Sequence, residues 1–224
     1  MILWAIKDDS LKSNSKSCFS SRTSSLEPQL LRRVEMKQAR VLNDKELRSV
    51  LNSTKLTRYQ HRNKLMMMLS YCAGLRACEI ASLRISDVIG SDGEAKHTIL
   101  LERWQTKGTQ RQQAVVSEKL RKEITQYVRE HRAKAPADAP LLASQKGGAF
   151  SSQTIQQVFR QLYEQVGMDG ASSHSGRRTM LTKLAERGVH ARVIQQIARH
   201  SSLATTQRYI EVSPHLLRNA VEML

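Results

Sequence analysis

From residue 43 onwards, apolar residues recur at helical spacing, and capping residues stand where helices would begin. Asn43–Glu46 forms a capping-box pattern in front of an apolar stripe, which predicts a helix start. A second helix is predicted over about 59–73, because its apolar residues share one face and Gly74 suits its end. A short third helix would carry Ile80 and Leu83.

The periodicity changes over residues 88–116. Thr98–Leu101 and Gln113–Val116 are typical of strands, and the polar segment Gln105–Gln110 with Gly108 separates them. This pattern predicts a hairpin or small antiparallel sheet.

The rest of the chain is predicted to be helical. Helices are expected from near Ser117, over a long apolar stripe ending at Gly167, and at about 178–186 and 191–198. Ala133–Pro140 has the composition of a linker. Ser213 and Pro214 suit the N-cap and first turn of a last helix of about 11 residues, too short to be stable alone.

Three regions follow from this pattern. Residues 1–35 include a serine-rich stretch without helical periodicity and are predicted to be a mobile or poorly ordered arm. Residues 36–212 are expected to form the folded domain, and residues 213–224 a C-terminal helix that must dock on other protein. The fold class is α+β, mainly α-helical, with a small antiparallel sheet.

Charge narrows the choice of partner. The 224 residues contain 36 Lys and Arg against 20 Asp and Glu, a net charge of +16, while 40% are hydrophobic. A folded chain with this excess points to a polyanion, with nucleic acid first and an acidic membrane surface second. No apolar run is long enough to span a membrane, no signal peptide is recognisable, and three cysteines without a C-x-x-C pair fit a reducing cytoplasm.

The candidate chemistry depends on cationic side chains. The sequence has no glycine-rich phosphate loop and no carboxylate cluster for magnesium, so neither a metal nor another cofactor is expected. Phosphoryl chemistry without a metal needs other cations around the phosphate, and the planar fork of arginine matches two phosphate oxygens. Four segments offer such groups: Arg76 after Gly-Leu, Lys107 in the predicted turn, the pair His174 and Arg177, and His200 followed nine residues later by Tyr209.

Each of these segments alone is a common surface feature, but their order is specific. From about Leu42 to Val212 the chain resembles the tyrosine recombinase family, of the phage-integrase and Xer type. Gly74-Leu75-Arg76 with Glu79 resembles the first-arginine motif of that family, and Lys107-Gly108 with Arg111 resembles its hairpin lysine. His174 and Arg177 match its H-x-x-R box, and His200 and Tyr209 match its spacing from histidine to tyrosine. The length is similar to that of the fimbrial-switch inversion recombinases.

The resemblance implies a catalytic domain that cleaves and rejoins duplex DNA. Tyr209 would attack a phosphodiester, form a 3′-phosphotyrosine and release a 5′-hydroxyl. His174 would be the general base, and Lys107 would protonate the leaving oxygen. Arg76, Arg177 and His200 would stabilise the transition state, and Glu79 would orient Arg76. Exchange of one phosphoester for another needs no nucleotide energy.

The sequence departs from the family in three places near these motifs. Gly176 stands where a bulky apolar residue is usual, which would loosen the positions of His174 and Arg177. Arg178 stands where a second histidine is common, and Ala198-Arg199 replaces Leu-Gly before His200. Arg178 and Arg199 are therefore candidate phosphate contacts, as is Arg111.

The resemblance also implies partners. These are duplex DNA with specific recombination sites and further copies of the chain, up to a tetramer. About 40 residues precede the matching region, too few for the DNA-gripping domain of typical members, so an accessory clamp or DNA-bending protein would compensate. The C-terminal helix would dock on a neighbouring protomer, with packing on its own domain as the alternative.

Three other functions fit part of the evidence. Leu184–Gly188 and Val193–Ala198 can be read as a helix-turn-helix of a non-catalytic DNA-binding regulator, although such a protein needs neither Lys107 nor Tyr209. A topoisomerase of the related tyrosine class would share the chemistry. A decayed recombinase would bind sites without cutting them.

Overall fold

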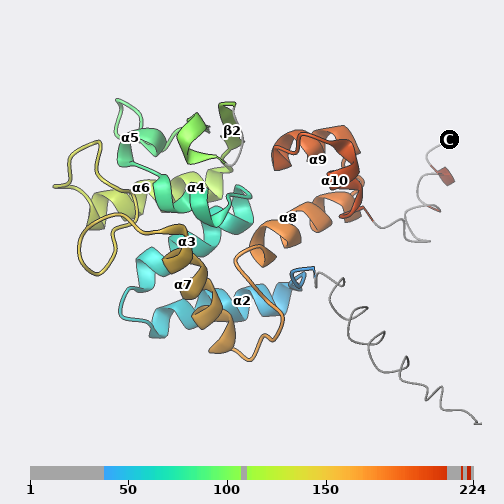
Figure 1. The fold of residues 1–224 in the computed structure, drawn as a ribbon, viewed down its shortest axis with the longest axis horizontal. Helices are drawn as coiled ribbons and strands as arrows, with labels where there is room; N and C mark the ends of the chain where they lie inside the picture. The colour runs from blue at the N-terminus through green and yellow to red at the C-terminus, as the bar shows by residue number, and fades with distance from the viewer. Residues whose placement is uncertain (1–37, 107–109, 211–217, 219–220, 223–224) are drawn as a thin grey trace, which may run out of the picture. The chain divides into compact units, whose positions relative to one another are not determined.

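The structure, a computed structural model, describes residues 38–106, 110–210, 218 and 221–222 (Figure 1). Residues 1–37, the predicted turn lysine Lys107 and most of the predicted C-terminal helix lie outside the described residues. The elements are, in chain order, α2 (Asp44–Ser53), η1 (Thr54–Leu56), α3 (Gln60–Cys72), α4 (Ala77–Ser82), α5 (Ile85–Val88), β1 (Thr98–Leu101), η2 (Arg103–Gln105), β2 (Gln112–Val115), α6 (Glu118–His131), α7 (Ser152–Glu164), α8 (Ser175–Glu186), α9 (Ala191–Ala198) and α10 (Leu203–Gln207). The described part is mainly helical with one small sheet, as the sequence predicts.

Side-chain caps set several helix starts. At α2 the Asn43 side chain accepts from the Glu46 amide, and the Glu46 carboxylate accepts from the Asn43 amide, both at 2.9 Å. This is the capping box that the sequence predicts. Ser117 and Ser151 cap α6 and α7 in the same way, each accepting from the amide three residues later.

Helix α3 is the centre of the main hydrophobic core. Leu65, Met66, Met67 and Leu69 are fully buried, and Met68 is nearly so. Phe159 and Tyr163 of α7 belong to the same cluster, and α3 packs against α6 and α8. Flexible methionine side chains fill irregular space among these helices.

The predicted hairpin is present. Strands β1 and β2 pair antiparallel, with Thr98 opposite Val115 and Leu101 opposite Gln112. Ile99 and Ala114 face the core, whereas Leu100 and Val115 on the other side of the pleat are exposed. Over the described residues these two strands form the sheet, and Gln112 and Gln113 of β2 line a surface groove.

A second, smaller cluster joins α8 to α9. Leu181, Ala185, Ile194 and Ala198 are buried together, and Tyr209 packs against them half-buried. This cluster fixes the segment after α9, which carries His200 and Tyr209.

The structure differs from the expected elements at three points. Helix α8 begins at Ser175 rather than near 178, because its polar first turn is buried by packing on α3. The third predicted helix ends at Ser82 and is followed by the separate short helix α5. Helix α10, capped by Ser202, was not predicted, because its five residues are too few to form an apolar stripe.

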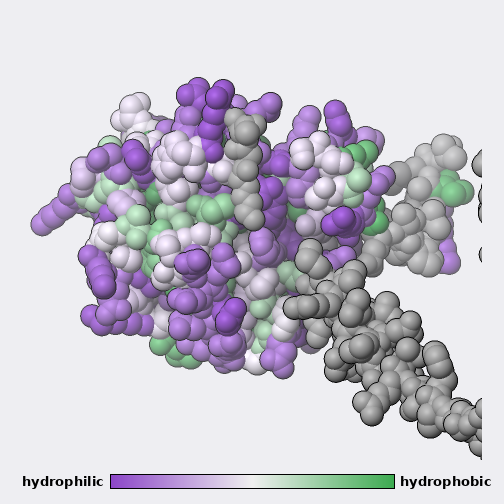
Figure 2. All heavy atoms as spheres, in the orientation of Figure 1, coloured by the Kyte–Doolittle hydropathy of each residue, from purple (hydrophilic) through white to green (hydrophobic). Residues whose placement is uncertain are grey.

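Among the described residues no helix combines the length and apolar character that membrane crossing requires. The visible face in Figure 2 is largely hydrophilic, with smaller hydrophobic areas between the hydrophilic residues.

Gly176 brings α8 close to α3. A Cβ at this position would lie 2.7 Å from the Ser70 hydroxyl oxygen and 3.2 Å from the Ser70 Cβ. Ser70 is completely buried, so it has little room to yield. The expectation that Gly176 loosens this segment was wrong: the absent side chain permits close packing of the turn that carries Arg177.

Replacing Gly176 with alanine is therefore expected to destabilise the domain. Overpacking costs about 1–3 kcal/mol, while the better helix propensity of alanine returns at most about 1 kcal/mol. We predict a lower urea midpoint for Gly176→Ala and little change for the control Gly148→Ala, where nothing lies within 4 Å of the added Cβ. A Gly176→Ala midpoint equal to or above that of the wild type would contradict the close packing.

Candidate active site

The candidate site is built around the buried carboxylate of Glu79, in the first turn of α4. Its Oε1 accepts from the Arg76 guanidinium at 2.6 Å, and its Oε2 accepts from the Arg76 amide at 2.8 Å. Arg199, from the end of α9, donates to Oε2 at 2.6 Å. Burial alone would raise the pKa of Glu79, but the Arg199 charge and the bonds from Arg76 outweigh it and lower the pKa. Glu79 is therefore an ionised group that fixes two arginines.

Arg177 enters the site from α8. Its guanidinium donates to the carbonyl oxygens of Gly74 and Ala198, so it joins the turn before α4 to the end of α9. Burial, together with the Arg76 and Arg199 charges, lowers the pKa of Arg177 to about 9. Arg177 therefore still carries its charge at neutral pH.

Gly74 makes this connection possible. Its φ of 59° lies in the left-handed region, and a Cβ there would meet the Met180 methyl group at 2.6 Å. The sharp turn presents the Gly74 carbonyl oxygen to both Arg177 and Arg199. A glycine that sequence reasoning assigned to ending α3 thus also supplies an acceptor for the site.

His200 lies in the turn between α9 and α10. Its Nδ1 is 3.0 Å from the hydroxyl of the buried Thr206, which orients the ring. Partial burial, followed by the charges of Arg177, Arg76 and Arg199, lowers the pKa of His200 to about 4. His200 is therefore neutral at pH 7 and can offer Nε2 for a hydrogen bond without carrying a charge.

Tyr209 follows α10 and lies against His200. The two rings are stacked with centroids 5.7 Å apart, and the Tyr209 amide donates to the Thr206 carbonyl. The Arg178 guanidinium lies 5.8 Å from the centre of the tyrosine ring. A cation at that distance attracts the ring face and helps to fix the phenol.

A groove of about 710 Å³ opens at this network. Residues from two sides line it: Arg76, Gln110, Gln112, Gln113, Gln196, Arg199, His200, Ser201 and Thr205. Its described lining contains arginine, histidine and neutral polar groups but no carboxylate, which suits an anion such as a phosphodiester. A slightly larger cavity, about 740 Å³, lies between the start of α3 and α7 and contains none of the site residues expected from the sequence.

The structure thus brings together seven of the residues expected from the sequence: Arg76, Glu79, Arg177, Arg178, Arg199, His200 and Tyr209. His174 is exposed at the N-cap of α8, whereas Arg177, three residues later, is buried. Arg111 on the hairpin is exposed and pairs with Glu102 at 2.7 Å. Arg199, expected to be a phosphate contact, instead has a side chain only 3% exposed and bound to Glu79.

Sequence reasoning missed two contributors. Thr206 is absent from the residues expected from the sequence, although its hydroxyl orients the histidine. The position six residues after His200 and three before Tyr209 is the one signal that the sequence offers. The second is the Gly74 carbonyl, and backbone acceptors leave no sequence signal.

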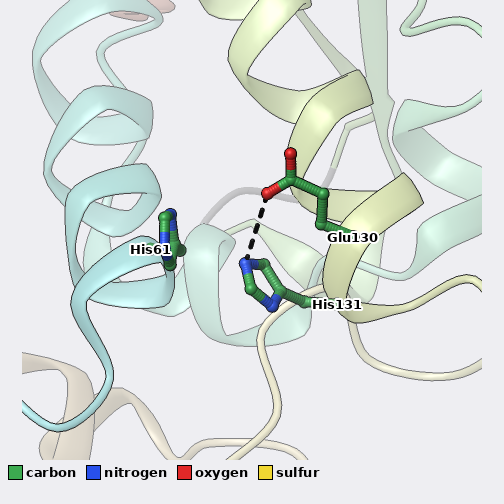
Figure 3. A group of neighbouring side chains, drawn as sticks. All are labelled: His61, Glu130 and His131. Carbon is green, nitrogen blue, oxygen red and sulfur yellow. Dashed lines mark ion pairs between the residues drawn. The ribbon is translucent and has the colours of Figure 1, made fainter.

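One other cluster has metal-ligating side chains. His61 at the start of α3 lies near Glu130 and His131 at the end of α6, with ligand atoms within 4.8 Å of one another (Figure 3). All three are exposed, and arginines 58, 62 and 132 line the adjoining cavity. Three nearby guanidinium groups repel a divalent cation, and the cluster shares no residue with the groove, so we assign it no role in the site.

Comparison with known proteins gives consistent matches. Residues 40–215 match the phage integrase family. The chain is 30% identical over 161 residues to the tyrosine recombinase XerA of Pyrococcus horikoshii, covering 72% of this chain and 54% of that protein. It is 32% identical over 162 residues to XerC of Methylobacterium nodulans, covering 72% and 48%.

Solved structures match in fold. A XerA recombinase superposes with a TM-score of 0.65 at 23% identity, over 82% of this chain and 62% of that one. The XerH recombinase bound to its difH substrate gives 0.63 at 23% identity, over 81% and 53%. The chain spans about half the length of the curated relatives it matches.

The low pKa of His200 predicts how stability depends on pH. Between the ordinary value of 6.5 and about 4, the unfolded chain binds a proton that the folded chain excludes. Acid therefore favours unfolding across this window, and the stability from a neutral His200, present above pH 6.5, is lost as the pH falls toward 4. We expect His200→Asn, which removes the titrating ring, to show a smaller drop in urea midpoint from pH 7 to pH 5.

The control is His61→Asn, at an exposed histidine outside the groove. Its pH dependence is expected to follow that of the wild type. The same drop in His200→Asn as in the wild type would show that His200 is not held neutral by its surroundings.

Proposed function

The chain belongs to the phage integrase family, and from this premise we propose that it cleaves and rejoins duplex DNA at specific sites through Tyr209. One observation carries the proposal. Two arginines, a neutral histidine and a tyrosine, from segments up to 133 residues apart, converge on one network beside an anion-suited groove. Core packing alone does not call for buried guanidinium groups next to a half-buried tyrosine.

The proposed reaction exchanges one phosphoester for another. The Tyr209 phenolic oxygen attacks phosphorus, a bond from phosphorus to that oxygen forms, and the bond from phosphorus to the 5′-oxygen breaks. The phenol must lose its proton during the attack, and His174 is the proposed base. Lys107, which lies between β1 and β2 in the sequence, is proposed to give a proton to the leaving 5′-oxygen. The reverse attack by a 5′-hydroxyl rejoins DNA without nucleotide energy.

Arg76, Arg177 and His200 are proposed to stabilise the transition state. Arg76 and Arg177 have fixed guanidinium groups, and His200 offers a neutral donor, so all three can bind the nonbridging oxygens as their negative charge grows. Because Glu79, the Gly74 carbonyl and the Thr206 hydroxyl hold these three groups before DNA binds, little reorganisation is needed during the reaction. Loss of one such donor is expected to slow cleavage about 10²–10³-fold.

The proposed partners are duplex DNA and other copies of the chain, up to a tetramer. XerH bound to difH is one related structure with DNA, and the net charge of +16 supports the same kind of partner here. A clamp or DNA-bending protein is proposed to assist, and the last residues, 213–224, are proposed to dock on a neighbouring protomer. Similarity to fimbrial-switch inversion recombinases stays a prediction, since the relatives reported above are Xer recombinases.

A nicked suicide substrate tests the nucleophile. DNA flanking the coding sequence would supply candidate sites, and covalent complexes would be resolved on a denaturing gel. We expect a DNA-linked band with the wild type and none with Tyr209→Phe, which should still bind the same DNA within about fivefold, since one hydroxyl is lost. A regulator or decayed enzyme would bind without forming the band.

Tyr59→Phe is the matched control. Its ring packs against arginines through the ring face, which phenylalanine preserves, so the covalent band is expected to remain. A band that persists in Tyr209→Phe would assign the nucleophile to another residue.

The salt dependence of binding tests phosphate contact by Arg111. The logarithm of affinity is expected to fall linearly with the logarithm of salt concentration, and Arg111→Gln to reduce the slope by about 1 if its side chain neutralises one phosphate. Arg129→Gln is a close control, because Arg129 is equally exposed and likewise paired with a glutamate. Fluorescence anisotropy with a site-containing duplex would measure both, and equal slopes for the two variants would exclude an Arg111 contact.

A further inference from the structure

Arg199 has an unusual backbone conformation. Among the described residues it is the only non-glycine with positive φ, at φ 55° and ψ 44°, and it ends α9 where glycine is the common choice. Left-handed backbone is unfavourable for a residue with a Cβ, and arginine has no short polar side chain to compensate locally. Such a conformation persists where surrounding contacts require it, and it is frequent at functional sites.

The side chain of Arg199 supplies those contacts. Its Nη2 donates to Glu79 Oε2 at 2.6 Å and to the Gly74 carbonyl at 3.1 Å, and its Nη1 lies 3.4 Å from the Ala73 carbonyl. With the side chain 3% exposed, the guanidinium faces protein rather than solvent. Although Arg199 also borders the groove, its Nη1 and Nη2 are engaged by these protein acceptors. They are therefore poorly placed to bind a DNA phosphate, which is the role that the sequence suggested.

Both main acceptors of Arg199 are shared with a proposed catalytic arginine. Glu79 also holds Arg76, and the Gly74 carbonyl also holds Arg177. The next residue in the chain is His200. One side chain therefore connects the positions of three groups that are proposed to act on the same phosphate.

Arg199 also affects the charge balance of the site. Without it, the completely buried Glu79 would keep only one guanidinium partner, which is costly for a buried ion. Its charge is one of those that lower the pKa of His200. Removing it is therefore expected to weaken the positioning of Arg76 and to let His200 bind a proton more readily.

We propose that Arg199 is a positioning residue that locks Glu79 and the Gly74 carbonyl to the His200 turn, so that Arg76, Arg177 and His200 face one phosphate. It does this without contacting DNA. The inference rests on the proposed function of the site. In it, Arg199 affects the reaction only through the proposed catalytic groups that it holds in place.

The decisive variant is Arg199→Gly, because glycine keeps the left-handed turn while the guanidinium is lost. At saturating DNA we expect single-turnover cleavage to slow about 10–100-fold, as for other supporting residues around a reactive centre. DNA affinity is expected to stay within about twofold and the salt slope to be unchanged, because no phosphate contact is removed. Added guanidinium chloride, compared with sodium chloride at equal ionic strength, is expected to restore part of the rate by occupying the vacated space.

Two further variants separate positioning from general damage. Arg199→Lys keeps the charge and one donor, so its cleavage rate is expected to lie between those of the wild type and Arg199→Gly. If the glycine variant does not fold, the lysine variant still tests the proposal, because it is expected to cleave more slowly than the wild type at saturating DNA. Arg187→Gly is the matched control, since Arg187 also ends a helix but is exposed. Wild-type cleavage is expected there.

Three results would overturn the proposal. The first is a wild-type cleavage rate in folded Arg199→Gly. The second, where the glycine variant does not fold, is a wild-type cleavage rate in Arg199→Lys. The third is a decrease of both DNA affinity and salt slope in Arg199→Gly, as expected for a lost phosphate contact. A nuclear magnetic resonance titration of His200 gives a readout independent of catalysis, with its pKa expected to rise in Arg199→Gly. If the wild type forms no covalent complex, the proposed function fails, and an unchanged His200 pKa would then reject the role of Arg199 separately.

Discussion

A fully buried carboxylate is the constraint on which the site depends. Glu79 has no exposed surface, and an ionised group in that position is tolerated only when its oxygens are hydrogen-bonded and its charge is matched. The requirement is met by Arg76 from its own helix turn and by Arg199, 120 residues further along the chain. Satisfying one buried charge therefore draws the end of α9, and with it His200 and Tyr209, to the start of α4.

Two glycines allow the backbone to approach closely enough for this network. Gly74 turns the chain so that its carbonyl oxygen meets two guanidinium groups, and Gly176 lets the first turn of α8 lie against α3. Together they bury the Arg177 side chain between the two segments that Glu79 links. Partial burial, followed by the charges of the resulting cluster of three arginines, lowers the pKa of His200 and keeps its ring neutral. The fold thus sets the protonation states of the groups that it positions.

The sequence predicted what local patterns encode. The α2 capping box, the extent of α3, the limits of α9 and the antiparallel hairpin follow from spacing and capping chemistry, which act over a few residues. The motif residues Arg76, Glu79, Arg177, His200 and Tyr209 were found because their types and order resemble a known family.

The role of Arg199 was not accessible in this way. A basic residue beside a site reads from sequence as a phosphate contact, whereas its burial depends on a carboxylate 120 positions away. Helix α10 and the early start of α8 were also missed, because long-range packing rather than periodicity stabilises them. Lys107 and most of the C-terminal helix lie outside the described residues, so their roles stay predictions.

Mass spectrometry of a trapped protein–DNA complex tests the central claim most directly. Tryptic cleavage after Arg208 and Arg218 releases Tyr209 in a peptide of residues 209–218, where it is the single tyrosine. After nuclease digestion, our account predicts that this peptide carries a nucleotide 3′-phosphate on the tyrosine oxygen. A covalent adduct on any other peptide, or attachment through a 5′-phosphate, would contradict it.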